Sequence, residues 1–148
     1  MKKKILMFSA ALATVAAVAV PAQAQFAKAE DAVKYRQSAF TLMSNHMGRL
    51  AAMAKGERPF DAAAAQASAR VIQTVGQLPW DAFPAGSTSK GIKGDPWKNA
   101  ADFKQRADRF LAESAKLPEA AATLEGLRKQ VGATGASCKG CHDEYRES

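Results

Sequence analysis

The stretch EAAATLEGLRKQVGATGASCKGCHDEYR, residues 119–146, decides the fold expected of this chain. Its apolar and small side chains recur at alternating steps of three and four residues, the spacing of one face of an α-helix. The members of this face are Leu124, Leu127, Val131, Thr134, Cys138, Cys141 and Tyr145. Because the register passes through Gly132 and Gly135 without a slip, the pattern predicts one helix from about Glu119 to Arg146.

Three earlier segments have the same periodicity. The first is predicted to run from Ala29 to Lys55, where Gly56 follows as a helix stop. The second begins at Asp61, a good N-cap, and continues until Pro79. The third opens with Asp95-Pro96, an N-cap followed by a proline at the first helical position, and ends near Lys116, before Pro118.

A long loop is predicted between the second and third helices. Residues 79–94 are rich in Gly, Ser, Pro and Lys, which favours a loop, and loops of this length in compact domains are often functional. Alanine is abundant in the whole chain and β-branched residues are sparse, which favours helices over strands. The sequence therefore predicts an all-α protein, an antiparallel four-helix bundle with two short turns and one long loop.

The first 24 residues have the layout of a secretory signal peptide. Three lysines precede an apolar run from Ile5 to Val20, and Ala22-Gln23-Ala24 supplies the small-residue cleavage pattern. The apolar run is shorter than the roughly 20 residues that span a bilayer, so a membrane anchor is the less favoured interpretation. We expect cleavage after Ala24, a folded domain over residues 25–148, and export to the periplasm without membrane attachment.

The charge of the chain argues against a nucleic-acid partner. Loss of Lys2, Lys3 and Lys4 with the leader would lower the formal charge from +7 to +4. The remaining excess is scattered, with no basic block and no interleaved aromatic residues, so nucleic-acid binding is not expected.

Both cysteines of the chain lie in one motif, Cys138-x-x-Cys141-His142. On a helix these three residues are at positions i, i+3 and i+4 and project from one face. Two thiols on one face can add across the two vinyl groups of a haem, and the adjacent imidazole can then reach the iron. Cys-x-x-Cys-His is the motif of c-type haem attachment. It predicts one covalently bound haem c per chain, with His142 as the metal ligand.

Three other uses of the cysteines compete with haem attachment. A thioredoxin-like redox pair is expected near a βαβ pattern, which this chain lacks. A zinc site built from cysteine and histidine would have to recruit His46, the only histidine outside the motif. A structural disulfide would not require the histidine. Haem attachment is favoured because it uses all three residues.

Three stretches resemble the cytochrome c′ family, the class II c-type cytochromes. They are DAVKYRQSAF at residues 31–40, LPWDAF at 78–83 and GASCKGCHDEYR at 135–146, and they occur in the expected order across residues 25–148. The resemblance implies a haem-binding four-helix bundle, usually a homodimer, with five-coordinate high-spin iron. It also implies a bacterial periplasmic protein that binds nitric oxide, carbon monoxide or a similar gas, transfers single electrons to an unidentified redox partner, or does both, and is not an enzyme.

The resemblance also assigns roles to individual residues. It places Phe40 at the open side of the iron, where a phenyl ring, which has no lone pair to donate, would exclude water and be displaced by an incoming gas. Arg36 and Gln37 match a haem-contacting pair, and an arginine can bind a haem propionate through two hydrogen bonds. Arg146 matches a basic residue beside the proximal histidine. Simple alternatives are core packing for Phe40, a solvated Arg36 and a helix-dipole contact for Arg146.

Trp80 and Phe83, in the long loop, are expected to pack on the edge of the haem or to cap the bundle. Packing in the core alone would explain both aromatic residues equally well.

Two other functions remain open on sequence alone. A low-spin electron-transfer cytochrome with the same bundle would use a sixth ligand from the first helix, for which Met43 and Met47 are candidates and His46 a weaker one. A weak haem enzyme, resembling a peroxidase or a nitric oxide reductase, would want a distal acid–base pair, commonly histidine with arginine. Phe40 at the distal position disfavours the peroxidase.

Mass spectrometry of the intact protein tests the cofactor assignment. Protein from a host competent in cytochrome maturation should be heavier than the cleaved polypeptide by the mass of one haem, and denaturation should not remove that mass. A colourless protein whose mass is that of the polypeptide with one disulfide would contradict haem attachment.

Overall fold

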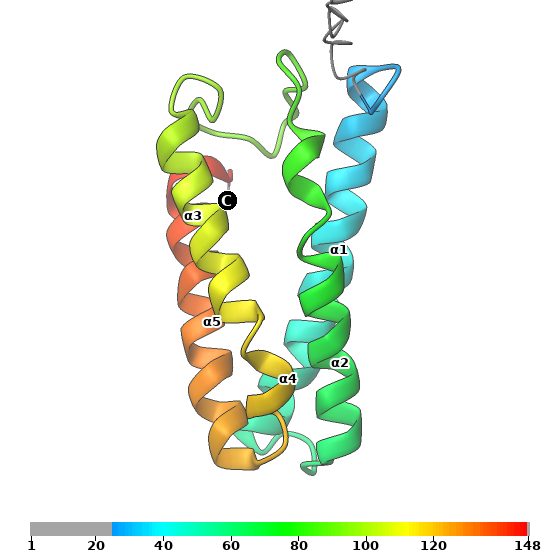
Figure 1. Ribbon diagram of the computed structural model, residues 1–148, viewed down its shortest axis with the longest axis vertical. Coiled ribbons are helices and arrows are strands. Elements are labelled where there is room, and N and C mark those ends of the chain that lie inside the picture. The colour runs from blue at the N-terminus through cyan, green and yellow to red at the C-terminus, as the bar shows by residue number, and fades with distance from the viewer. Residues whose placement is uncertain (1–24, 148) are drawn as a thin grey trace, which may run out of the picture.

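Two pairs of long helices make up residues 25–147, the part of the chain that the computed structural model describes (Figure 1). Helix α1 (Ala29–Lys55) packs against α2 (Ala62–Val75), and α3 (Ala100–Ser114) packs against α5 (Leu124–Tyr145). Contacts between α1 and α5 join the two pairs. The predicted all-α four-helix bundle is confirmed. The predicted signal peptide lies outside the described residues.

Helix α1 has the bounds that the sequence predicts. Gly56 ends it with a φ of +81°, in the left-handed region that a residue with a Cβ rarely adopts. The start of α2 also matches the prediction, because the Asp61 side chain accepts a hydrogen bond from the backbone N–H of Ala64 at 2.9 Å.

The second helix ends earlier than predicted, and the loop after it is not entirely irregular. Helix α2 stops at Val75, and Pro79 opens a short 3₁₀ helix, η1 (Pro79–Ala82). The indole N–H of Trp80 donates a hydrogen bond to the backbone oxygen of Gly76 at 2.7 Å, which holds η1 against the end of α2. Hydrophobic periodicity in the sequence does not predict this side-chain contact.

The predicted start of the third helix is wrong by about four residues. The Asp95 carboxylate accepts hydrogen bonds from the backbone N–H groups of Trp97 and Lys98, which closes a local turn over residues 95–98. The helix itself begins at Ala100 and ends at Ser114, slightly before the predicted Lys116.

The predicted fourth helix is divided. Residues Leu117–Ala120 form a short helix, α4, with Pro118 in its first turn, and α5 begins only at Leu124. Thr123 has an extended backbone, and its side chain accepts a hydrogen bond from the N–H of Gly126 at 3.1 Å, so it is the N-cap. At the other end Tyr145 is the last helical residue, and Arg146 is extended.

An aliphatic core fills the bundle toward the end that carries α4. Its buried residues come from all of the α-helices, and Phe40, Trp80 and Cys138 pack against its border. The core residues are Met43, Leu50, Met53, Ala65, Ala69, Ile72, Phe110, Leu117, Ala121 and Leu127.

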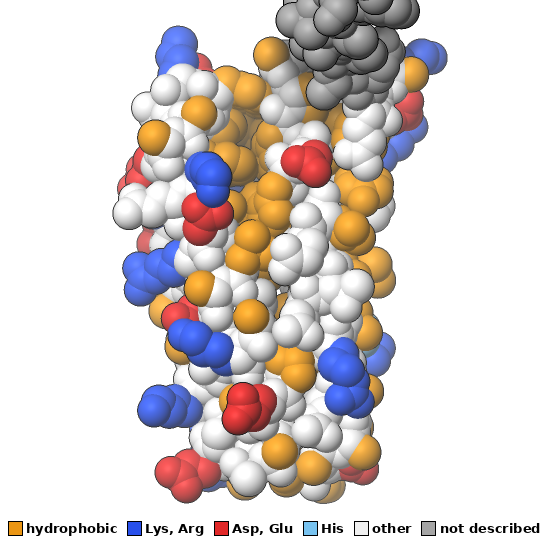
Figure 2. Space-filling view, viewed as in Figure 1, with side chains coloured by type: hydrophobic (Ala, Val, Ile, Leu, Met, Phe, Trp, Pro, Cys, Tyr) orange, Lys and Arg blue, Asp and Glu red, His pale blue; other side chains and the backbone are white. Residues whose placement is uncertain are grey.

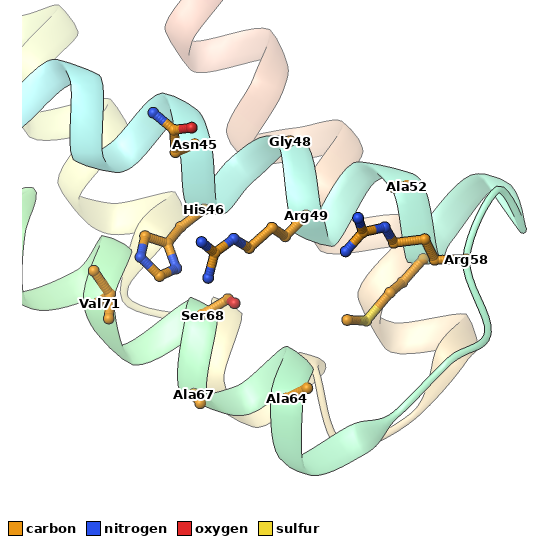
Figure 3. Close-up of a pocket in the computed structure, with 11 residues that line it drawn as sticks. Asn45, His46, Gly48, Arg49, Ala52, Arg58, Ala64, Ala67, Ser68 and Val71 are labelled. Atoms are coloured by element: carbon orange, nitrogen blue, oxygen red, sulfur yellow. The ribbon is translucent and has the colours of Figure 1, made fainter.

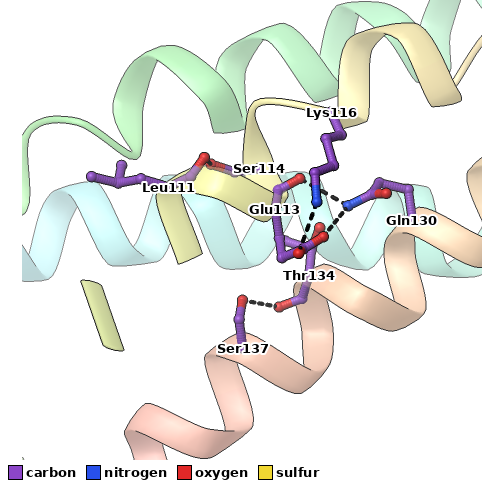
Figure 4. A network of polar contacts seen from close by, with 7 residues as sticks. All are labelled: Leu111, Glu113, Ser114, Lys116, Gln130, Thr134 and Ser137. Atoms are coloured by element: carbon purple, nitrogen blue, oxygen red, sulfur yellow. Dashed lines mark hydrogen bonds and ion pairs between the residues drawn. The ribbon is translucent and has the colours of Figure 1, made fainter. Parts of the chain in front are cut away.

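A polar network ties α5 to the end of α3 (Figure 4). The Gln130 amide donates to the backbone oxygen and to the carboxylate of Glu113, both at 2.9 Å, and Lys116 pairs with the same carboxylate at 2.9 Å. These hydrogen bonds, from Gln130 first and then Lys116, lower the pKa of Glu113. The network fixes the position of α5 along α3.

Within residues 25–147, none of the helices has both the length and the apolar character that crossing a membrane requires.

A pair of leucine substitutions tests the core. Leu50 is 0 % exposed in the core, whereas Leu78 is 43 % exposed. We expect Leu50→Ala to lower the free energy of unfolding by about 2–5 kcal/mol, because it removes buried methyl groups and leaves a cavity. The control Leu78→Ala should change it by less than about 0.5 kcal/mol. Guanidinium titrations of both variants measure the difference, and equal effects would contradict this core.

Candidate functional site

Aromatic side chains gather at the end of the bundle that holds the long loop and the C-terminus of α5. Figure 2 shows hydrophobic side chains in the hollow between the two helix pairs, in the upper half of the view. The ring of Trp80 lies 6.1 Å from Phe40, 6.2 Å from Phe103 and 6.0 Å from Phe110, between ring centroids. We call the following residues the aromatic cluster: Phe40, Trp80, Phe83, Phe103, Phe110 and Tyr145.

Phe103 connects this cluster to the helix that carries the cysteines. Its ring centroid lies 4.8 Å from that of Phe83 and 5.2 Å from that of Tyr145, both with T-shaped geometry. Aromatic contacts therefore run without interruption from Phe40 on α1 to Tyr145 on α5.

Cys138 and Cys141 lie on α5 as free, partly buried thiols, and Cys138 packs against the core. Burial raises the pKa of both thiols, most strongly through desolvation of the thiolate. Both thiols are therefore protonated at neutral pH. The structure describes them without a disulfide.

His142 follows on the same helix, with an exposed side chain. Partial desolvation lowers the pKa of its imidazole, and the positive charge of Arg146 lowers it further. The imidazole is consequently neutral near pH 7, the form that has a lone pair for a metal.

The donor set fits a haem better than a bare metal ion. Over residues 25–147 no three or more His, Cys, Asp or Glu side chains are grouped so that they could hold a metal ion. Two protonated thiols and one neutral imidazole, beside an aromatic cluster, match the requirements of thioether attachment and axial ligation. A flat, largely apolar macrocycle would find aromatic contacts there.

Three polar side chains hold the cysteine segment against α3, and the sequence pattern assigns a functional role to none of them. Arg106 donates to the backbone oxygen of Gly140, between the two cysteines, and to the Asp102 carboxylate at 2.7 Å. The Tyr145 hydroxyl donates to the same carboxylate at 2.7 Å. Burial and this bond raise the pKa of Tyr145 to about 12. The i, i+4 spacing of Asp102 and Arg106 was visible in the sequence, but their partners on α5 were not.

The long loop fastens the residues that follow His142. Ile92 and Arg146 form an antiparallel bridge, in which Lys93 N–H donates to the oxygen of Tyr145 at 3.3 Å. Gly94 has a φ of +66°, and a Cβ there would lie 2.8 Å from the oxygen of Glu144, so glycine allows this close approach. Arg146 itself is exposed at the end of α5.

Arg36 and Gln37 occupy different environments. Arg36 is 2 % exposed, and its guanidinium donates at 2.8 Å to the Ala82 oxygen and the Ser87 hydroxyl, and also to the Ser87 oxygen. It lies 4.4 Å from the Phe83 ring centroid, so Arg36 holds the loop to the aromatic cluster. Gln37 is exposed on α1 and lines a shallow hollow with Ser38 and Thr41.

The alternative ligands on α1 occupy different environments. Met43 is buried in the aliphatic core, and Met47 packs against that core. His46 faces the space between α1 and α2. Of the residues that the sequence predicts for the site, the structure brings Phe40, Trp80 and Phe83 together in the aromatic cluster. That cluster reaches Tyr145 at the end of α5.

A comparison with known families decides the identity. The family model for cytochrome c′ matches residues 31–146. The chain belongs to the cytochrome c′ family. Members bind covalently attached haem c, so the family, the fold and the cofactor predicted from the sequence are confirmed.

Similar proteins cover most of this cytochrome c′ chain. Cytochrome c′ from Alcaligenes xylosoxydans xylosoxydans is 48 % identical over 125 residues, which are 83 % of this chain and 98 % of the relative. The crystal structure of cytochrome c′ from Rubrivivax gelatinosus matches with a TM-score of 0.79 at 44 % identity, covering 83 % of this chain and all of that one. A nitric oxide complex of a mutant cytochrome c′ from Alcaligenes xylosoxidans matches with a TM-score of 0.79 at 47 % identity, covering 84 % and 99 %.

The contact between Asp102 and α5 predicts a pH dependence of stability. Hydrogen bonds from Arg106, and then from Tyr145, lower the pKa of Asp102 in the folded protein. A lowered folded pKa contributes stability above the unfolded pKa of about 4, and this contribution is lost as the pH falls through the folded pKa. Asp102→Asn should therefore be less stable than wild type at pH 7, with a difference that shrinks in acid.

Asp108→Asn is the matched control. Asp108 is on the same helix, is exposed, and pairs only with Lys104 one turn away. Urea titrations between pH 7 and pH 3 should show little pH-dependent difference for this variant. If the stability of Asp102→Asn and of Asp108→Asn depended on pH in the same way, the bonds of Asp102 to Arg106 and Tyr145 would not contribute to stability.

Proposed function

We propose that this protein is a periplasmic cytochrome c′ whose haem iron is five-coordinate and high-spin and binds nitric oxide or a similar small gas, transfers single electrons, or does both. In this proposal Cys138 and Cys141 attach the haem, and His142 is the proximal ligand. Removal of residues 1–24 as a signal peptide delivers the domain to the periplasm. The homologous nitric oxide complex supports the choice of gas.

The chain presents the two thiols and the imidazole that covalent attachment of a haem requires. Each protonated thiol would add across one haem vinyl group, with a carbon–sulfur bond formed and the thiol hydrogen passed to the other vinyl carbon. His142 supplies its lone pair from a neutral imidazole. Arg106, through the Gly140 oxygen, orients the short segment that holds both sulfurs. When bound, the haem supplies an iron with one open position for a diatomic gas and a one-electron couple.

The observation that carries the proposal is the place of Phe40. Its half-buried ring lies within the aromatic cluster, at edge-to-face distance from Trp80, on the helix opposite the cysteine segment. A phenyl ring cannot coordinate iron, and it excludes water from the face that it covers. We infer that a small apolar gas enters by displacing this ring.

The structural surroundings of Phe40 do not favour the enzyme alternative. Arg36 lies one turn before Phe40, but its guanidinium is bonded to Ala82 and Ser87 in the loop. His46 lies in the space between α1 and α2. A peroxidase-like distal pair of histidine and arginine therefore has no counterpart beside Phe40 in the described residues.

Other residues receive subordinate roles in the proposal. Three N–H donors of Arg36 bond Ala82 and Ser87, and the other two are proposed to bond one haem propionate. Gln37 is proposed to bond the other propionate, with Trp80 and Phe83 against the haem edge. Arg146, whose charge reaches the His142 imidazole, is proposed to lie beside the proximal ligand. A homodimer is proposed on the family resemblance.

Truncation of the distal ring tests the role of Phe40. Phe40→Ala should speed carbon monoxide binding to the ferrous protein, because the gas no longer has to displace the ring from Trp80. An aromatic pair contributes about 0.5–1.5 kcal/mol, which corresponds to a gain of roughly two- to tenfold in rate. Stopped-flow absorbance in the Soret band measures this rate.

Phe26→Ala is the control for aromatic truncation. Phe26, which precedes α1, packs on Tyr35 in the second turn of that helix, with 5.1 Å between ring centroids. This pair lies outside the aromatic cluster. The control should bind carbon monoxide at the wild-type rate. An unchanged or slower rate in Phe40→Ala would show that the ring does not cover the gas-binding face.

A further inference from the structure

A cavity with a mostly apolar wall and a few charged side chains lies between α1 and α2 (Figure 3). It has a volume of about 740 Å³ and opens to solvent. Its walls come from α1, from the turn after α1, and from α2. None of the functions described above uses this cavity.

The charges around the cavity are all of one sign. Arg49 on α1 and Arg58 in the turn line it, together with His46, and no aspartate or glutamate is among its lining residues. Glu57, beside Arg58 in the chain, is 3.8 Å from the Lys55 ammonium. From α2 the facing polar side chain is Ser68, which is neutral. Figure 3 shows the Arg49 guanidinium between His46 and Ser68, and the Arg58 side chain pointing towards the same space from the turn.

The imidazole of His46 has an unused polar atom at this cavity. Its Nδ1 is buried and has no hydrogen-bond partner in the described part of the chain. A buried polar atom without a partner costs free energy, so Nδ1 needs a partner from outside the polypeptide, either water or a ligand. A ligand oxygen in the cavity would supply the missing partner.

We propose that this cavity is a binding site for an oxyanion, a phosphate or sulfate group, held by Arg49, Arg58 and the Nδ1 of His46. Guanidinium groups form charge-assisted, paired hydrogen bonds with such oxygens, and they match an anion better than a neutral ligand. The apolar wall from Ala64, Ala67 and Val71 leaves room for the organic part of a small phosphate-bearing molecule. The site is independent of the haem.

Titration of His46 offers a direct readout of occupancy. In the free protein, burial and then the positive charge of Arg49 lower the pKa of this imidazole. A bound anion offsets the charge of both arginines and favours the protonated imidazole, so it should raise that pKa. The chain has two histidines, and paramagnetic iron would broaden and shift the Cε1 signal of His142. ¹³C labelling at the imidazole Cε1 therefore leaves one sharp signal, which His46→Gln assigns by its loss.

The experiment compares sodium sulfate with sodium chloride at equal ionic strength, on the haem-loaded protein. Sulfate is the probe because its charge is constant across the pH range in which histidine titrates. We expect a saturable rise in the pKa of His46 with sulfate and none with chloride. The double variant Arg49→Gln, Arg58→Gln should bind sulfate at least about tenfold more weakly, because it loses the charge-assisted bonds.

Arg70→Gln is the control for loss of positive charge, since Arg70 is exposed on α2 and does not line the cavity. It should respond to sulfate as wild type does. An identical pKa of His46 in sulfate and chloride, as expected if a second copy of the chain covered the cavity, would overturn the proposal. A response that survives in the double variant would overturn it as well.

Discussion

The structure depends on holding two sulfur atoms and one imidazole on a single face at the end of α5. Helical geometry places Cys138, Cys141 and His142 together, but it does not fix that helix end relative to the rest of the bundle. Arg106 does so by bonding the Gly140 oxygen between the cysteines, and Asp102 holds both Arg106 and Tyr145. The attachment segment is thereby fixed to α3 at two points, the Gly140 oxygen and the Tyr145 hydroxyl.

The bundle divides its interior between two tasks. Toward α4, aliphatic residues such as Leu50 and Leu127 are fully buried and provide stability. Toward the loop, edge-to-face contacts of the aromatic cluster link α1, η1, α3 and α5. Large, flat side chains of this kind can pack against a planar cofactor. The buried guanidinium of Arg36 joins the loop to this second region. The aliphatic residues and most of the aromatic cluster thus lie towards opposite ends of the same four helices.

Local patterns in the sequence predicted what local physics determines. The limits of α1 follow from periodicity and from Gly56, and the attachment motif is complete within five residues. The predicted start of the last helix, Glu119, is wrong because Thr123 is the N-cap and α5 begins at Leu124. The preceding run of alanines favours a helix and hides this boundary in the sequence. The bonds of Arg36 to Ser87 and of Arg106 to Gly140 join residues 51 and 34 positions apart, so only the tertiary fold reveals them.

The central claim is that iron is held from one side by His142 while the other side faces a side chain that cannot coordinate it. Electron paramagnetic resonance of the purified ferric protein, with optical spectra of the ferric and ferrous forms, tests this claim most directly. The account predicts high-spin signals in both oxidation states. A low-spin spectrum would contradict it, because a nitrogen or sulfur donor such as His46, Met43 or Met47 would then have to occupy the position assigned to Phe40.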